Sequence, residues 1–150
     1  MRTRTASASG AHEGYQNFFL GTDGMNIATS VDTEAFYRKY DYPHAEIRNI
    51  GVPVETGKWH AFEVYLRLSA TAGKGIFRAW QNGNMIFEDK DTPTLRSSNS
   101  SVTQASVWTY WNNTAPKSQT AYIDDVVMTS ETPKGRDANG NPFIGLNANL

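Results

Sequence analysis

The chain has 150 residues, which is the size of a single domain. Its 14 Lys and Arg residues nearly balance its 15 Asp and Glu residues, so a strongly basic nucleic-acid binder is not expected. The chain has no cysteine, which excludes disulfides, cysteine–zinc sites and a thiol nucleophile. The sequence contains neither an apolar run long enough to span a membrane nor the apolar stretch of a secretory signal near its start.

The first half of the chain predicts a polar arm followed by short strands. Residues 1–14 are rich in Ser, Thr, Ala and Gly and predict an N-terminal arm. Short strands are predicted at residues 17–21, 25–30, 35–39 and 46–50.

The clearest strand pattern covers residues 59–70. It alternates between an apolar face with Phe62, Val64, Leu66 and Leu68 and a second face with Glu63, Tyr65 and Arg67. We expect the Phe62 and Leu66 side to point inward.

The second half predicts a hairpin, two strands and a second arm. Asn82-Gly83 separates the strand at residues 75–81 from Met85-Ile86-Phe87, and this dipeptide is typical of a type I′ turn. Residues 102–111 and 120–129 predict two more strands, while 92–101 predict a loop. Residues 134–150 predict an extended arm that Phe143, Ile144 and Leu146 would anchor. Seven to nine short strands without a helical period predict an all-β, two-sheet antiparallel sandwich.

The order of three segments resembles a known superfamily. Residues 57–60 (GKWH) open a strand, residues 75–84 (GIFRAWQNGN) resemble a family hairpin, and residues 121–128 (AYIDDVVM) resemble its closing strand. Together they resemble the concanavalin A-like lectin/glucanase superfamily, in particular its polysaccharide lyases and laminin-G-like modules, over roughly residues 36–133. The resemblance implies a compact jelly roll at residues 15–133, with a concave sheet that forms a groove for glycans. The chain is shorter than the catalytic members, which implies that N-terminal strands are missing or reduced.

Glycan binding requires flat aromatic rings beside groups that bind hydroxyls. Residues of these types fall on predicted strand faces that could line one groove: Tyr65, Arg67, Arg78, Trp80, Trp108 and Tyr110. The alternative is that Trp80 and Trp108 fill the core.

Catalysis is less expected than binding. The paired carboxylates of a glycosidase, arranged as E-x-D-x-x-E, are absent from the sequence. A uronate lyase needs a Tyr or His base and a cation, for which the candidates are His44, Arg48, His60 and Tyr110. HAEIR at residues 44–48 is faintly similar to the R-x-E-x-R strand of alginate lyases; the alternative is an exposed ion pair between Glu46 and Arg48.

Two acidic segments raise the question of calcium. The resemblance implies that Asp124 on the closing strand holds a structural Ca²⁺, with Glu13 as a partner, and oxygen ligands suit that ion. The alternatives for Asp124 and its neighbour Asp125 are a salt bridge or a turn cap. Residues 137–140 (DANG) resemble the opening of a calcium loop, but Ala148 stands where an EF-hand needs Glu, so we predict a turn.

Three functions follow from these patterns. The first is a non-catalytic, lectin-like module that binds a glycan. The second is a polysaccharide lyase or a fragment of one. The third is a structural or decoration protein, on a virion or another large assembly, that contacts other subunits through residues 1–14 and 134–150. For all three, an extracellular or virion-surface location is the expectation.

Overall fold

The computed structural model describes residues 2–6, 12–23, 26–33, 48–91, 93–95, 97–105, 117–118 and 120–145. These residues form eight strands: β1 (Arg2–Ala6), β2 (His12–Asp23), β3 (Asn26–Thr33), β4 (Arg48–Pro53), β5 (Phe62–Arg67), β6 (Ile76–Gln81), β7 (Asn84–Asp89) and β8 (Ser100–Gln104). The described part of the chain contains no helix, and so none that could cross a membrane. The strand-rich character predicted from the sequence is confirmed for these residues.

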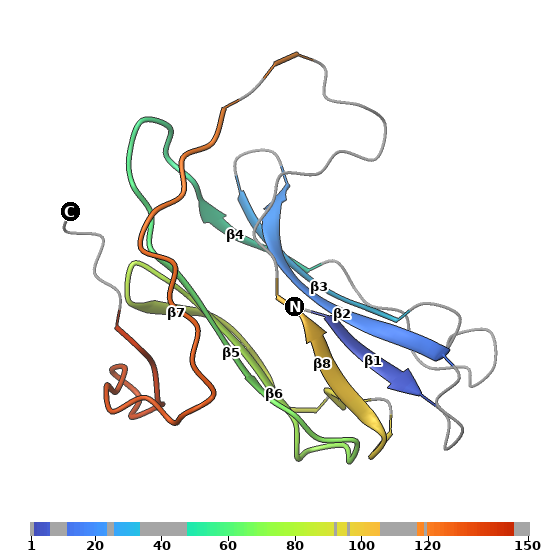
Figure 1. Cartoon of the computed structure of the whole chain (residues 1–150). Helices are drawn as coiled ribbons and strands as arrows, with labels where there is room; N and C mark the ends of the chain where they lie inside the picture. The colour runs from blue at the N-terminus through green and yellow to red at the C-terminus, as the bar shows by residue number, and fades with distance from the viewer. Residues whose placement is uncertain are drawn as a thin grey trace.

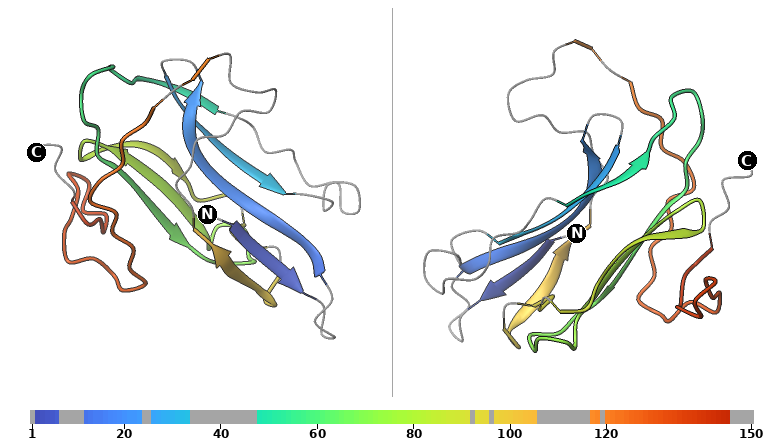
Figure 2. Two further views of the ribbon diagram at one scale, coloured as in Figure 1. Left: turned by 45° about the horizontal axis from the view of Figure 1, so that its top comes forward. Right: turned by 180° about the vertical axis from the view of Figure 1, so that it is seen from behind.

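The strands form two antiparallel sheets. One has five strands in the order β4-β3-β2-β1-β8, and the other has three in the order β5-β6-β7. Figures 1 and 2 show the sheets as two layers, with residues 130–145 on the side of the three-stranded sheet that faces away from the five-stranded sheet. We call this side of the three-stranded sheet the outer face.

The N-terminal residues are part of a sheet rather than an extended arm. β1 is hydrogen-bonded between β2 and β8, and its Thr5 pairs with Gly14 of β2. The predicted strands at 17–21, 25–30 and 46–50 coincide with or overlap β2, β3 and β4, whereas the one at 35–39 lies outside the described residues. Backbone ladder bonds to two neighbours hold β1, although its side chains show no apolar alternation.

The predicted hairpin is confirmed. Gln81 pairs with Asn84, and the two residues between them have positive φ, 50° at Asn82 and 80° at Gly83, as a type I′ turn requires. A bulge follows in β7, where Ile86 is the extra residue between the partners of Ala79 and Trp80.

The core of the described region lies on the inner side of this hairpin. Phe77, Ala79 and Phe87 are buried, and the two phenyl rings meet edge to face at 5.4 Å between centroids. Leu66 and Ile86 pack against this cluster. Every residue of β6 is buried, because one face meets this core and the other is covered from outside.

The alternation predicted for β5 is confirmed in register but only partly in burial. Tyr65 pairs with Arg78 and Glu63 with Trp80, so these residues share the outer face. However, Phe62 and Val64 on the opposite face are 38% and 40% exposed. β5 is an edge strand, so its inner side chains are covered on one flank only.

The strand predicted at residues 120–129 is not formed, so this prediction was wrong. The chain there pairs with no strand among the described residues, and its backbone turns at Asp125, which has a φ of 50°. The Asp125 amide donates to Asp124 Oδ1 at 2.8 Å. Such local side-chain bonds compete with sheet ladders, and Asp tolerates positive φ better than most residues. Of the predicted strand at 102–111, residues 102–104 belong to β8 and 106–111 lie outside the description.

Candidate functional site

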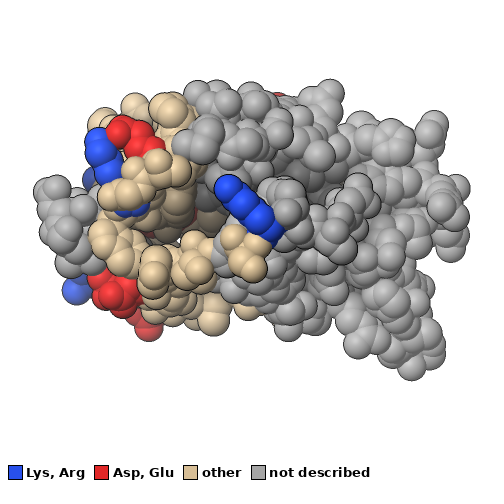
Figure 3. All heavy atoms as spheres, turned by 90° about the horizontal axis from the view of Figure 1, so that it is seen from above, with Lys and Arg blue, Asp and Glu red and all other residues tan. Residues whose placement is uncertain are grey.

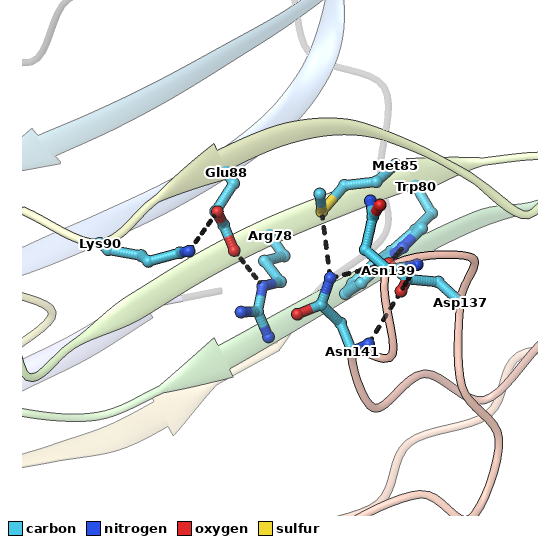
Figure 4. A network of polar contacts seen from close by, with 8 residues as sticks. All are labelled: Arg78, Trp80, Met85, Glu88, Lys90, Asp137, Asn139 and Asn141. Carbon is cyan, nitrogen blue, oxygen red and sulfur yellow. Dashed lines mark hydrogen bonds and ion pairs between the residues drawn. The ribbon is translucent and has the colours of Figure 1, made fainter.

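A network of polar contacts on the outer face of the three-stranded sheet contains Arg78 and Trp80, two of the residues expected to bind a glycan (Figure 4). Arg78 lies at its centre and is almost fully buried. Its Nε donates to Glu88 Oε1 at 2.6 Å, and its guanidinium lies 5.8 Å from the centre of the Tyr65 ring. Glu88 also pairs with Lys90 at 2.7 Å.

The charges of this group compensate one another. Burial alone would raise the pKa of the Glu88 carboxyl, but hydrogen bonds and charge from Lys90 and Arg78 outweigh it, so the pKa is lowered. Arg78 is therefore a paired structural cation whose guanidinium is already bound on two sides.

Trp80 is covered by the C-terminal segment, which we define as residues 136–145. Trp80 is 1% exposed, and its indole N–H donates to Asp137 Oδ2 at 2.9 Å. The Phe143 ring packs over the indole with 6.1 Å between centroids. The flat face that sugar stacking would need is thus occupied by protein.

Asp137 organises the turn that covers Trp80. Its Oδ1 accepts the backbone amides of Asn139 and Asn141, and its Oδ2 accepts the Asn141 side-chain amide as well as the indole. Burial alone would raise the pKa of this carboxyl, but these hydrogen bonds lower it to about 2. Gly140 closes the turn with a φ of 80°. The turn predicted at residues 137–140 is therefore confirmed.

Glu63 fastens the end of the C-terminal segment. Its two carboxylate oxygens accept the backbone amides of Ile144 at 2.5 Å and Gly145 at 3.1 Å. A shallow hollow beside Phe143 leaves no enclosed space for a water molecule. Phe143 and Ile144 thus anchor this segment, as predicted, while Leu146 lies outside the described residues.

The predicted glycan-binding residues differ in their exposure to solvent. Tyr65, Arg78 and Trp80 share the outer face, but Arg78 and Trp80 are buried there. Arg67 is exposed, and its Nε donates to the Lys74 carbonyl at 2.9 Å. Trp108 and Tyr110 lie outside the described residues.

Of the predicted lyase residues, His60 is the one whose side chain is described. Its Nδ1 lies 3.2 Å from Gln81 Nε2, which also donates to the Pro53 carbonyl at 3.1 Å. Because an amide nitrogen only donates, His60 Nδ1 must accept, and its proton sits on Nε2, 2.9 Å from the Glu55 carbonyl. Both ring nitrogens are therefore engaged within the protein.

Three further residues complete the lyase set: His44, Arg48 and Tyr110. His44 and Tyr110 lie outside the described residues, and Arg48 begins β4 with its side chain undescribed.

The predicted calcium ligands are not brought into a described site. Asp124 is exposed and accepts the Asp125 amide, while Glu13 lies in β2 with its side chain undescribed. Calcium binding by Asp124 and Glu13 remains a prediction from the resemblance.

Trp59 is a surface feature that sequence reasoning missed. Its side chain is 52% exposed, although the loop that carries it is firmly held. Gly57 makes the turn with a φ of 75°, Lys58 pairs with Glu55, and the His60 ring stacks on Phe62 at 6.1 Å. The sequence did contain a signal for this exposed position, because Trp59 directly follows a Gly-Lys turn and precedes an alternating strand.

The described surface shows no single charged patch in the view from above (Figure 3). Basic and acidic side chains lie together in small groups at one end of this view, and one basic group lies apart from them, in keeping with the near-neutral charge of the whole chain.

Comparisons with protein-family models, with curated proteins and with solved structures found no match to this chain. Its class is therefore argued from its own residues.

Proposed function

We propose that this protein is a non-catalytic glycan-binding module, built on a β-sandwich of the concanavalin A-like jelly-roll kind. Two antiparallel sheets in two layers support the sandwich. The single observation that supports glycan binding is the half-exposed Trp59 on a fixed loop.

An exposed indole on a fixed backbone suits sugar recognition. The CH groups of a pyranose ring pack on a flat aromatic face, and tryptophan offers the largest such face. Because the His60, Lys58 and Gly57 contacts already hold the loop, binding would order few additional groups. The side chains of Lys58 and Glu55 beside it are exposed and supply a donor and an acceptor for sugar hydroxyls.

In this proposal the outer face supports the fold rather than the ligand. Trp80 fixes the C-terminal segment through Asp137, and Arg78 neutralises the Glu88 carboxylate, so both side chains are already engaged within the protein. Among the residues predicted to contact glycan, Arg67 has an exposed guanidinium that remains suited to the role.

A glycan array, run with calcium and again with a chelator, is the first test. We expect saturable binding to at least one glycan class, and loss of binding with chelator would support the predicted calcium site. The hit is then titrated against Trp59→Ala and, as a matched control, Trp80→Phe. We expect the first variant to weaken binding at least about tenfold, or about 1.4 kcal/mol, because it removes the aromatic face on which the sugar packs. We expect the second variant to leave binding unchanged.

Two results would contradict this assignment. One is an array without hits for a protein verified as folded. The other is binding that survives Trp59→Ala and is lost in Trp80→Phe, which would indicate that the glycan binds on the outer face.

A further inference from the structure

The most exposed apolar part of the described chain is the segment at residues 121–128, which we call the unpaired segment. Five of its side chains are between 53% and 79% exposed: Tyr122, Ile123, Val126, Val127 and Met128. Large apolar side chains exposed together along one segment indicate an interaction site. Its β-branched and aromatic composition is typical of a strand, yet no strand pairs with it in the described structure.

The same chain offers an edge that can accept a strand. β5 ends the order β5-β6-β7, so among the described residues its outer edge is hydrogen-bonded to no strand. Edge strands with open N–H and C=O groups are templates for strand addition. Figures 1 and 2 show the unpaired segment running along the three-stranded sheet without joining it.

The charges of the two elements are complementary. Asp124 and Asp125 are both exposed in the unpaired segment. Arg67 at the end of β5 is also exposed, and its bond to the Lys74 carbonyl brings a second cationic residue beside it. An acidic pair that meets this basic pair would fix the register of the added strand.

We infer that the unpaired segment of one chain adds antiparallel to β5 of a second copy of the same chain. With Asp125 opposite Arg67, antiparallel pairing sets Val126 opposite Leu66 and Met128 opposite Val64. Residues directly opposite one another share a face, so these apolar side chains would cover the exposed inner side of β5.

A second copy is the occupant that the geometry favours. Each chain carries both the donor segment and the acceptor edge, so a reciprocal exchange closes into a two-fold dimer in which both copies of β5 gain a neighbour. Straightening the segment also removes the positive φ of Asp125. This inference does not rest on glycan binding by the loop around Trp59, although Arg67 has a part in both proposals.

The first test measures the mass of the full chain in solution by light scattering over a wide range of concentration. We expect the mass to rise from 16.7 kDa to twice that value. Val126→Lys should raise the dissociation constant of the dimer at least about tenfold, because it places a charge at the centre of the new contact. Val126 is exposed in the single chain, so this variant keeps its fold. Asp125→Arg should weaken the dimer as well, and adding Arg67→Asp should restore it.

The second test uses the absence of cysteine from the chain. The Met128→Cys variant is mixed with a Val64→Cys variant that carries a mass tag, and the mixture is oxidised. We expect a disulfide that joins one tagged chain to one untagged chain. A mass that stays at 16.7 kDa at every concentration would overturn the inference. So would a dimer indifferent to Val126→Lys, or a disulfide within a single chain when both cysteines are placed in the same molecule.

Discussion

Asp137 stabilises the turn over Trp80 as an ionised carboxylate. It is 57 residues away from Trp80 in the sequence, yet its two oxygens accept four hydrogen bonds, one of them from the indole. Hydrogen bonds to an ionised group are worth roughly 1.5–3 kcal/mol each in net stability, which is more than those of a neutral amide. The charge of Asp137 should therefore be visible in the stability of the whole chain.

We predict that Asp137→Asn lowers the free energy of unfolding by about 2 kcal/mol at neutral pH, the value that the fall in its pKa from 3.8 to about 2 implies. Because the pKa is lower in the folded state, this contribution is complete above the unfolded pKa and is lost as the pH falls through about 2. Urea denaturation of both proteins at several pH values checks this. The exposed Asp91→Asn is the control, and a difference that does not shrink in acid would contradict the prediction.

Thr94 binds the backbone at the end of β5 and just after it. Its hydroxyl donates to the Arg67 carbonyl at 2.7 Å and accepts the Ser69 amide at 2.8 Å, while its side chain is 2% exposed. We predict that Thr94→Val costs about 1–3 kcal/mol, because both backbone groups lose their partner in a buried place. Thr94→Ser keeps the hydroxyl and should cost less. Thermal unfolding measures both, and equal losses would show that packing rather than hydrogen bonding matters here.

At the scale of elements, two glycines of the β5–β7 region are needed for different reasons. Gly83 has a φ of 80° in the hairpin turn, with nothing within 4 Å of an added Cβ. At Gly75, an added Cβ would lie 2.7 Å from Thr94 Oγ1. The first position restricts backbone conformation, whereas the second restricts volume.

We predict that Gly83→Ala costs about 1–2 kcal/mol, because a residue with a Cβ pays that amount in the left-handed region. Gly75→Ala costs about 1–3 kcal/mol through overpacking against Thr94. The two causes separate in the double variant with Thr94→Ala, which removes both the hydroxyl and the methyl group beside Gly75. That change should reduce the cost of Gly75→Ala and leave the cost of Gly83→Ala as it was. Equal effects on both would contradict this account.

Local signals explain which elements could be predicted from the sequence. The β6–β7 hairpin was predictable because Asn82-Gly83 sets its own turn geometry. β1 was missed because residues 2–6 have no apolar alternation and depend on ladders with β2 and β8. The strand at 120–129 was predicted from its composition, but the bond from the Asp125 amide to Asp124 turns the backbone instead.

The burial of Trp80 by the C-terminal segment could not be predicted from the sequence, because it depends on contacts between distant residues. The sequence correctly grouped Tyr65, Arg78 and Trp80 on one face, since strand alternation is a local property. It could not show that Asp137 and Phe143 come to lie over that face, because no periodicity links residues so far apart. Anchors in the C-terminal arm were predicted, but not the surface that they cover.

At the scale of the whole molecule, Trp59 and Trp80 have opposite surroundings. Trp59 precedes the three-stranded sheet and is exposed, whereas Trp80 inside that sheet joins it to the C-terminal segment. We propose that Trp59 binds a glycan and that the unpaired segment mediates assembly. One domain would thus bind a glycan and pair with a second copy through different surfaces.

The most direct measurement is the nuclear magnetic resonance spectrum of the indole N–H groups, recorded while the glycan found on the array is added. The chain has four tryptophans, so the spectrum is simple, and Trp59→Phe assigns the resonance that matters. We expect the Trp59 resonance to shift with saturation, while that of Trp80, bonded to Asp137, stays in place. A shift of the Trp80 resonance with an unmoved Trp59 would contradict this expectation.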